Sequence, residues 1–180
     1  TIQLTDDADI VGDIANYGTI QNLNVTAANR IAIDLSAQTT AGNAITLSNH
    51  GTITGQVALG NADSVTQGED ATISSAVTSH GTLYGGETTR VITNNGGTIS
   101  NTSTSTGDAI EVASLIEGVS NSGSITAAGT GASSALRLGG VSTSGGIANT
   151  ADGTFTSYGT DATIQLTDDA DIVGDIANYG

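Results

Sequence analysis

An 18-residue string occurs twice in this chain. Residues 1–18 read TIQLTDDADIVGDIANYG, and the same letters return at residues 163–180. Eighteen consecutive identities do not arise by chance or through ordinary divergence. The sequence therefore predicts a tandem array, in which residues 1–162 are one repeat unit and residues 163–180 begin the next, identical copy.

A shorter turn phrase recurs inside this long period. It consists of an apolar residue, any residue, Asn, any residue and Gly, followed by Thr or Ser and a second apolar residue. One copy has Ser79 in place of Asn, and two copies carry extra residues before the Thr. Six intervals between the phrases fill one unit, and the turn residues are Asn16, Gly18, Asn49, Gly51, Gly81, Asn94, Gly96, Asn121, Gly123, Gly153, Asn178 and Gly180.

Short segments of alternating apolar and polar residues lie between the turn phrases. Examples are residues 31–35, 109–112, 135–138 and 163–166. Alternation with a period of two indicates strands, and about three strands fit into each interval. Repeats of this length built from short strands are typical of a solenoid, in which each coil stacks on its neighbour.

The fold class predicted is therefore all-β, a parallel β-solenoid with about six rungs per 162-residue unit. Inward Ile, Val and Leu side chains are expected to stack from coil to coil, while Asn and Gly take left-handed backbone conformations at the corners. The turn Asn side chains are also expected to form a ladder. An antiparallel sandwich would explain the alternation but not six copies of one turn phrase. The interval from Gly81 to Gly96 is short for three strands, so a truncated coil or a different register is expected there.

The charge balance excludes several classes of partner. The chain has 18 acidic residues against three basic ones, Arg30, Arg90 and Arg137, and a net charge of −15. Nucleic acids and anionic membrane surfaces attract Lys and Arg, so neither is expected as a partner. No apolar run is long enough for a membrane-spanning helix, and no membrane insertion of this segment is expected. The regular spacing of the apolar residues argues against disorder.

The pattern resembles a known class of bacterial surface protein. Phrases such as Asn49-His-Gly51-Thr-Ile53 alternate with strands such as Ile31-Ala-Ile33-Asp-Leu35 over the whole chain. This alternation resembles the passenger regions of bacterial autotransporters and related large surface adhesins. The resemblance implies a right-handed parallel β-helix that is exported across the outer membrane and displayed at the cell surface. A verbatim long repeat is closer to the giant repetitive adhesins and surface fibres of this group.

Clustered carboxylates raise the question of a bound cation. The densest cluster comprises four acids that recur in the second copy of the string, namely Asp6, Asp7, Asp9, Asp13, Asp168, Asp169, Asp171 and Asp175. Glu69 and Asp70 form a weaker acidic spot. Ca²⁺ would relieve the repulsion between such carboxylates, although the spacing is not that of an EF-hand loop. We favour solvated acidic turns that keep the array soluble, with calcium as the alternative and no cofactor required.

Two other groups of residues invite a chemical interpretation. His50 and His80 fill the same slot of two successive turn phrases and are expected to lie close together, but two imidazoles without a third ligand are more often polar turn residues than a metal site. Asp34 and Glu111 occupy equivalent strand positions and are expected to face solvent, not to act as a catalytic pair. Aromatic residues are 3% of the chain, too few for a sugar-stacking groove. No catalytic residue is expected, and short Thr-x-Thr runs, as at 102–106, give little support for an ice-binding face.

The sequence thus predicts a structural role. We expect a segment of a secreted, tandemly repeated solenoid that forms a filament, stalk or adhesin shaft outside the bacterial cell. The expected partners are further copies stacked end to end, other fibres, or a host or cell surface. The alternative is a surface-layer or matrix binding module crosslinked by calcium, and a polysaccharide-degrading β-helix enzyme is a more distant one.

Overall fold

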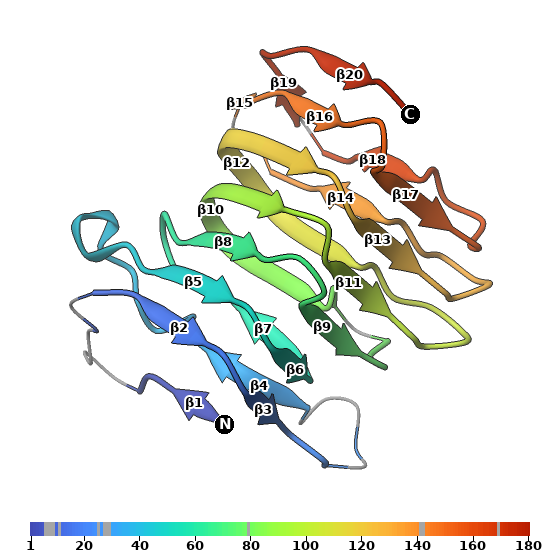
Figure 1. The fold of residues 1–180 in the computed structure, drawn as a ribbon. Helices are drawn as coiled ribbons and strands as arrows, with labels where there is room; N and C mark the ends of the chain where they lie inside the picture. The colour runs from blue at the N-terminus through green and yellow to red at the C-terminus, as the bar shows by residue number, and fades with distance from the viewer. Residues whose placement is uncertain are drawn as a thin grey trace.

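The chain winds as a solenoid in the computed structural model, which describes residues 1–5, 10, 12–24, 26, 30–78, 80–140, 143–168 and 170–180. Every strand pair found among these residues is parallel. The coils stack along one axis from β1 (Ile2–Gln3) to β20 (Ile176–Asn178), as Figure 1 shows. With about six turns, the all-β parallel solenoid predicted from the turn phrases is confirmed.

Each coil contributes strands to three faces, as the sequence predicts. Face 1 contains β2 (Ile14–Asn16), β5 (Thr46–Asn49), β8 (Ser64–Gln67), β16 (Ile147–Asn149) and β20. Face 2 contains β3 (Thr19–Gln21), β6 (Thr52–Thr54), β9 (Thr72–Ser75), β11 (Thr98–Asn101), β13 (Ser124–Ala127) and β17 (Thr154–Ser157). Face 3 contains β1, β4 (Ile31–Asp34), β7 (Gln56–Ala58), β14 (Leu136–Leu138) and β18 (Ile164–Leu166).

Two long strands join face 3 to face 1. The first residues of β10 (Leu83–Asn94) pair with β7 on face 3, and its last residues pair with β8 on face 1. In the same way β12 (Ile110–Asn121) pairs with β14 and then with β16. Smaller elements are the 3₁₀ turn η2 (Ala41–Asn43) and the pair β15 (Thr143–Ser144) with β19 (Asp171–Ile172). No helix among the described residues has the length and apolarity that a bilayer crossing requires.

Inward side chains form continuous rows along the axis. In β9, β11 and β13 of face 2, half-buried Thr or Ser residues alternate with buried residues, and the first buried residue of each strand is Ile. Ile53, Ile73, Ile99 and Ile125 face one another as successive partners, and none of them is exposed. Burial of one such side chain contributes about 1.5–3 kcal/mol. These rows therefore hold the stack together, because each coil gains its core from its two neighbours.

One turn phrase lies at a different corner from the one predicted. The inward row of face 1 is made by residues that pair in register, Ile14, Leu47, Val65, Ile92, Val119, Ile147 and Ile176. The phrase containing Gly81 instead precedes the face 3 part of β10, where Leu83 pairs with Val57 and Ile110. Gln67, at the end of β8, takes the corner position that Asn49 has in the preceding coil. The prediction that Gly81 is an equivalent turn residue is therefore wrong. With Val65 in the row, the shortest interval is the one from Leu47 to Val65, which still has room for the short strands β6 and β7 before β8.

The turn glycines are required for close stacking more than for an unusual backbone. Of the predicted turn residues only Gly96 has a positive φ, of 79°. At Gly51 an added Cβ would lie 2.1 Å from the carbonyl oxygen of Gly18, and at Gly123 it would lie 2.1 Å from that of Gly97. The predicted left-handed conformation of the turn Asn and Gly residues is therefore wrong at every turn position except Gly96. At Gly51 and Gly123 the neighbouring coils therefore approach so closely that no side chain fits.

Candidate functional site

The most regular polar feature of the molecule is a ladder of amides along the corner between face 1 and face 2. Asn16 Nδ2 donates to Asn49 Oδ1 at 2.7 Å, and Asn49 Nδ2 donates to Gln67 Oε1 at 2.9 Å. Farther along, four Asn side chains form three bonds of 2.8 Å, in the order Asn94, Asn121, Asn149 and Asn178. The Nδ2 groups of the first five Asn residues of the ladder also donate to backbone carbonyl oxygens of their own turn or of the next coil, namely those of Asn16, Asn49, Asn94, Asn121 and Asn149. The Asn ladder predicted from the turn phrases is present, and its role is to link coils.

The ladder has one interruption, between Gln67 and Asn94. Gln67 Nε2 donates to the carbonyl oxygens of Ala71 and Thr98, at 2.9 and 2.8 Å, and no bond runs from it to the next amide. As a result the buried Asn94 Oδ1 has no hydrogen-bond partner. This coil therefore carries the weakest link of the ladder.

The two His residues do not meet. His50 stacks on Tyr17, with ring centroids 5.0 Å apart and an angle of 5° between the planes. His80 stacks on Tyr84 at another corner, with centroids 5.0 Å apart and an angle of 15°. The prediction that His50 and His80 occupy equivalent positions is wrong for the same reason as that for Gly81, since the phrase containing His80 leads into face 3.

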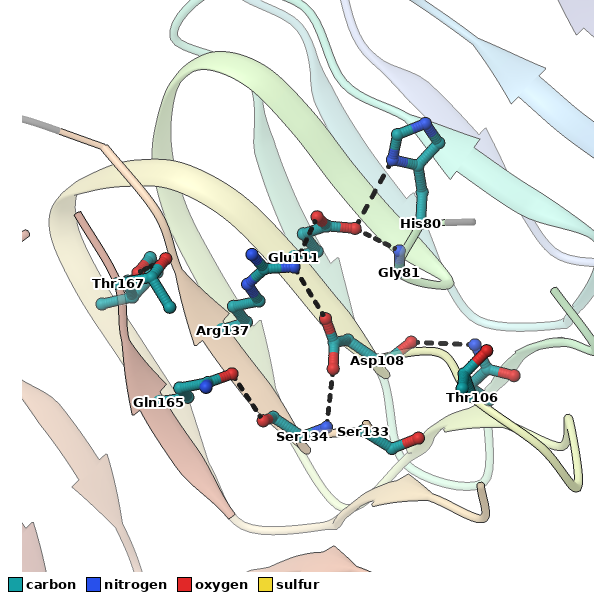
Figure 2. Close-up of polar contacts among 12 residues, drawn as sticks. His80, Gly81, Thr106, Asp108, Glu111, Ser133, Ser134, Arg137, Gln165 and Thr167 are labelled. Atoms are coloured by element: carbon teal, nitrogen blue, oxygen red, sulfur yellow. Dashed lines mark hydrogen bonds and ion pairs between the residues drawn. The ribbon is translucent and has the colours of Figure 1, made fainter. Parts of the chain in front are cut away.

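A polar cluster lies on the outside of face 3, where outward residues of successive coils are in register. Tyr84, Glu111, Arg137 and Gln165 are successive partners in this row, which begins with Gln3 and Asp34. Asp34 and Glu111 thus occupy equivalent strand positions, as predicted. Figure 2 shows that Glu111 lies between His80 and Arg137.

Glu111 is the centre of this cluster. Its Oε2 accepts the backbone N–H of Gly81 at 2.8 Å and lies 3.6 Å from His80 Nδ1. Its Oε1 lies 3.3 Å from Arg137 Nη1, which in turn is 3.8 Å from Asp108 Oδ2. A pocket of about 320 Å³ opens beside these groups, lined in part by Tyr84, Glu111 and Arg137. The cluster connects three successive coils, so it holds adjacent coils together through charge and hydrogen bonding.

Asp108 is the buried carboxylate of the cluster, with 7% of its surface exposed. Burial raises the pKa of Asp108 from its ordinary value of 3.8 to about 6, and the negative charges of Glu111 and Asp161 add to the rise. The backbone N–H of Ser134, which donates to Asp108 Oδ1 at 2.6 Å, and the charge of Arg137 oppose it. Asp108 can therefore take up a proton near pH 6, and its ion pair with Arg137 is lost when it does.

Titration of Asp108 is expected to make the stability of the solenoid depend on pH. Because its pKa is higher in the folded chain, the folded state binds more protons than the unfolded state between pH 3.8 and about 6. The stability that Asp108 contributes is full below this window and is lost as the pH rises through 6, by about 2–3 kcal/mol in total. The free energy of unfolding of Asp108→Asn, measured with urea, should therefore increase relative to that of the unchanged chain by about this amount between pH 4 and pH 7.5. Asp152→Asn, at an exposed turn, is the control, and parallel curves for Asp108→Asn and the unchanged chain would contradict the assignment.

The acidic residues of the repeated string are described only in part. Asp6, Asp7, Asp9 and Asp169 lie outside the described residues. Asp13 is exposed, and its Oδ1 accepts the backbone N–H of Thr46 at 3.1 Å. Asp168, Asp171 and Asp175 are exposed, as are Glu69 and Asp70. Within the described part of the chain no group of three or more His, Cys, Asp or Glu side chains is arranged to hold a metal ion. Calcium binding at the string stays a prediction.

Several residues that shape these contacts had no signal in the turn phrase. Asp63 is fully buried and accepts the backbone N–H groups of Ile45 and Gly60 at 2.9 and 2.8 Å; burial raises its pKa. Asp108 and Arg137 meet through coil stacking and not through sequence proximity. Tyr84 and Arg137 could have been found by aligning the strands of face 3, because both then fall in the row of Glu111. For Asp63 and Asp108 we find no pattern in the sequence that marks them.

The described strands of the two copies of the repeated string lie on the same faces of the solenoid, about six turns apart. In the first copy β1 lies on face 3 and β2 on face 1. In the second copy β18 lies on face 3, with Ile164 beside Leu136, and β20 lies on face 1, with Ile176 beside Ile147. One 162-residue unit therefore returns the chain to its starting orientation about the axis.

Comparison with known proteins leaves this geometry to stand by itself. No family model, no curated protein and no solved structure matches the chain.

Proposed function

We propose that this chain is a structural segment of a tandemly repeated solenoid, which forms a stiff shaft outside the bacterial cell as a filament, stalk or adhesin. The observation that carries this proposal is the matching position of the two copies of the string. Because β18 and β20 of the second copy lie on the same faces as β1 and β2 of the first, a further identical unit continues these faces without a break in register. Stiffness and length then increase with the number of units.

The polar contacts of the molecule support the same role. The amide ladder and the cluster around Glu111 both connect successive coils. The net charge of −15 limits side-by-side association between shafts. The resemblance to autotransporter passengers and giant adhesins accounts for the extracellular location in this proposal.

Electron microscopy of the native fibres tests the proposal through their axial repeat. Six coils at the strand spacing of about 4.8 Å give an expected rise of roughly 29 Å per 162-residue unit. Thin fibres with a meridional reflection near that spacing are the expected result. Compact particles without an axial repeat would contradict it, and the polysaccharide-enzyme and calcium-module alternatives would then be tested first.

A further inference from the structure

The turn that follows the ladder residue Asn94 differs from the corresponding turn in the next coil. Three residues, 95–97, separate Asn94 from β11, whereas two residues, 122–123, separate Asn121 from β13. Gly96 lies in the middle of the longer turn, where it is exposed and takes a positive φ of 79°. The extra residue therefore gives the backbone at Gly96 a different path from that of the shorter turn.

The backbone nitrogen of Gly96 is free as a result. In the turns of three other coils, the Oδ1 of the corner Asn accepts the backbone N–H of the residue two positions later, namely that of Gly18, Gly51 or Gly123, at 3.2, 3.3 and 3.2 Å. In the longer turn this bond is missing, because the buried Asn94 Oδ1 has no hydrogen-bond partner. Within the described part of the chain, the N–H of Gly96 has no other acceptor.

The side chain of Asn95, next to this nitrogen, has no partner either. It is exposed and makes no hydrogen bond to any residue that the structure describes, although the backbone N–H of Asn95 donates to the carbonyl oxygen of Gln67 at 2.8 Å. By contrast, the ladder amides are held by their neighbours, and Asn61 Nδ2 donates to the carbonyl oxygen of Thr39 at 3.0 Å. Asn95 is also the only Asn in the sequence that is followed by Gly.

The longer turn also has space for a ring at Gly96. The atom nearest to an added Cβ at Gly96 is Glu69 Cγ, 3.5 Å away. At Gly123, in the shorter turn, an added Cβ would lie 2.1 Å from the carbonyl oxygen of Gly97. Ring closure onto the backbone nitrogen would therefore meet the adjacent coil at Gly123 but not at Gly96.

We propose that Asn95 is a site of spontaneous covalent modification, at which its side-chain amide is lost as ammonia. The backbone nitrogen of Gly96 attacks Cγ of Asn95, the new N–C bond closes a five-membered imide, and the Cγ–Nδ2 bond breaks. The N–H proton of Gly96 passes through solvent to the departing ammonia. Water then opens the imide at Cγ, which gives Asp, or at the main-chain carbonyl, which gives isoaspartate. The reaction consumes water and needs no oxidant, reductant or enzyme.

Both products change the corner at which the amide ladder is interrupted. Isoaspartate lengthens the main chain by one carbon beside Asn94, whose Oδ1 already lacks a partner. Either product adds a negative charge next to Gly96, against which the exposed Glu69 lies. This chemistry goes beyond the proposed function, because it requires no assembly of units. Where units are joined in tandem, as proposed above, each unit carries one such site, and the charge of the shaft becomes more negative with age.

The variant Ser122→Asn gives a matched comparison within one chain. It creates a second Asn-Gly pair at the equivalent position of the next coil, where the N–H of Gly123 is bonded to Asn121 Oδ1 and the space is filled. The folded variant is kept in weakly alkaline buffer and digested, and its peptides are analysed for Asp and isoaspartate by chromatography and mass spectrometry. Conversion at Asn95 is expected to be about tenfold faster or more than at position 122, because the geometry of the reacting groups controls an intramolecular attack. In concentrated urea, where neither turn is formed, the two rates are expected to be similar.

The unchanged chain and Asn95→Gln complete the experiment. Release of ammonia from the folded, unchanged chain is expected to coincide with conversion at Asn95, and to fall sharply in Asn95→Gln, whose longer side chain would have to close a larger ring. Circular dichroism checks that each variant folds. Equal rates at the two Asn-Gly pairs of the folded Ser122→Asn variant would overturn the proposal. So would an Asn95 amide that persists in the folded, unchanged chain while it is lost in urea.

Discussion

Replacing Asn121 by Ala is expected to lower the free energy of unfolding by about 3 kcal/mol or more. Asn121 is fully buried, and its side chain donates to Asn149 Oδ1 and Thr154 O and accepts from Asn94 Nδ2 and the backbone N–H of Gly123. Alanine leaves Asn149 Oδ1 and the N–H of Gly123 without these partners. Each buried polar group that loses its partner costs about 1–3 kcal/mol, which is more than the net worth of a hydrogen bond.

Asn95→Ala is the matched control for this substitution. Asn95 directly follows the ladder residue Asn94 at the same corner, and its side chain is exposed. Its replacement is expected to change the free energy of unfolding by no more than about 0.5 kcal/mol. Urea unfolding followed by circular dichroism measures both variants. Equal values for Asn121→Ala and Asn95→Ala would show that the ladder contributes little.

The strands and their stacking could be predicted because each coil repeats the same local pattern. Ile-x-Asn segments such as those of β2 and β16 carry the inward apolar residue and the corner amide within three positions. Where the pattern is kept, the predicted neighbours are the real ones, as with Asn16 and Asn49. The ladder follows from the same regularity, since identical amides at identical corners must face one another.

The prediction of the turn residues failed where a residue other than Asn makes the hydrogen bonds of the corner. Gln67 fills an Asn position, so its segment does not match the turn phrase, whereas the segment around Gly81 does. The predicted position of His80 is wrong for the same reason, because His80 belongs to the same phrase as Gly81. A single-letter pattern cannot reveal such a substitution, because the equivalence lies in hydrogen bonding and not in residue identity.

The pairing of charged side chains in the polar cluster on face 3 could not be predicted from the sequence, for a different reason. Glu111 and Arg137 lie in neighbouring coils, and their contact depends on the register between β12 and β14. The distance along the chain between such partners varies with the turns that separate them. The charges could be assigned to strands from the sequence, but their pairing could not.

Substitutions at two glycines of the turn phrases are expected to differ sharply, and they test why those glycines are present. At Gly123 an added Cβ would lie 2.1 Å from the carbonyl oxygen of Gly97 and 2.7 Å from Asn94 Nδ2. At Gly96 the φ of 79° is the constraint, and the nearest atom to an added Cβ is 3.5 Å away, in Glu69. The first position lacks space, whereas the second requires only a left-handed backbone.

Asparagine separates the two causes, because it adopts the left-handed conformation more readily than alanine but is larger. Gly123→Ala and Gly123→Asn are both expected to lose about 3 kcal/mol or more, since the coils must move apart at the corner. Gly96→Asn is expected to cost less than about 1 kcal/mol, and Gly96→Ala somewhat more. Chemical unfolding of the four variants measures these differences. If Gly123→Asn were as stable as Gly96→Asn, close stacking of the coils would not be the reason for a glycine at position 123.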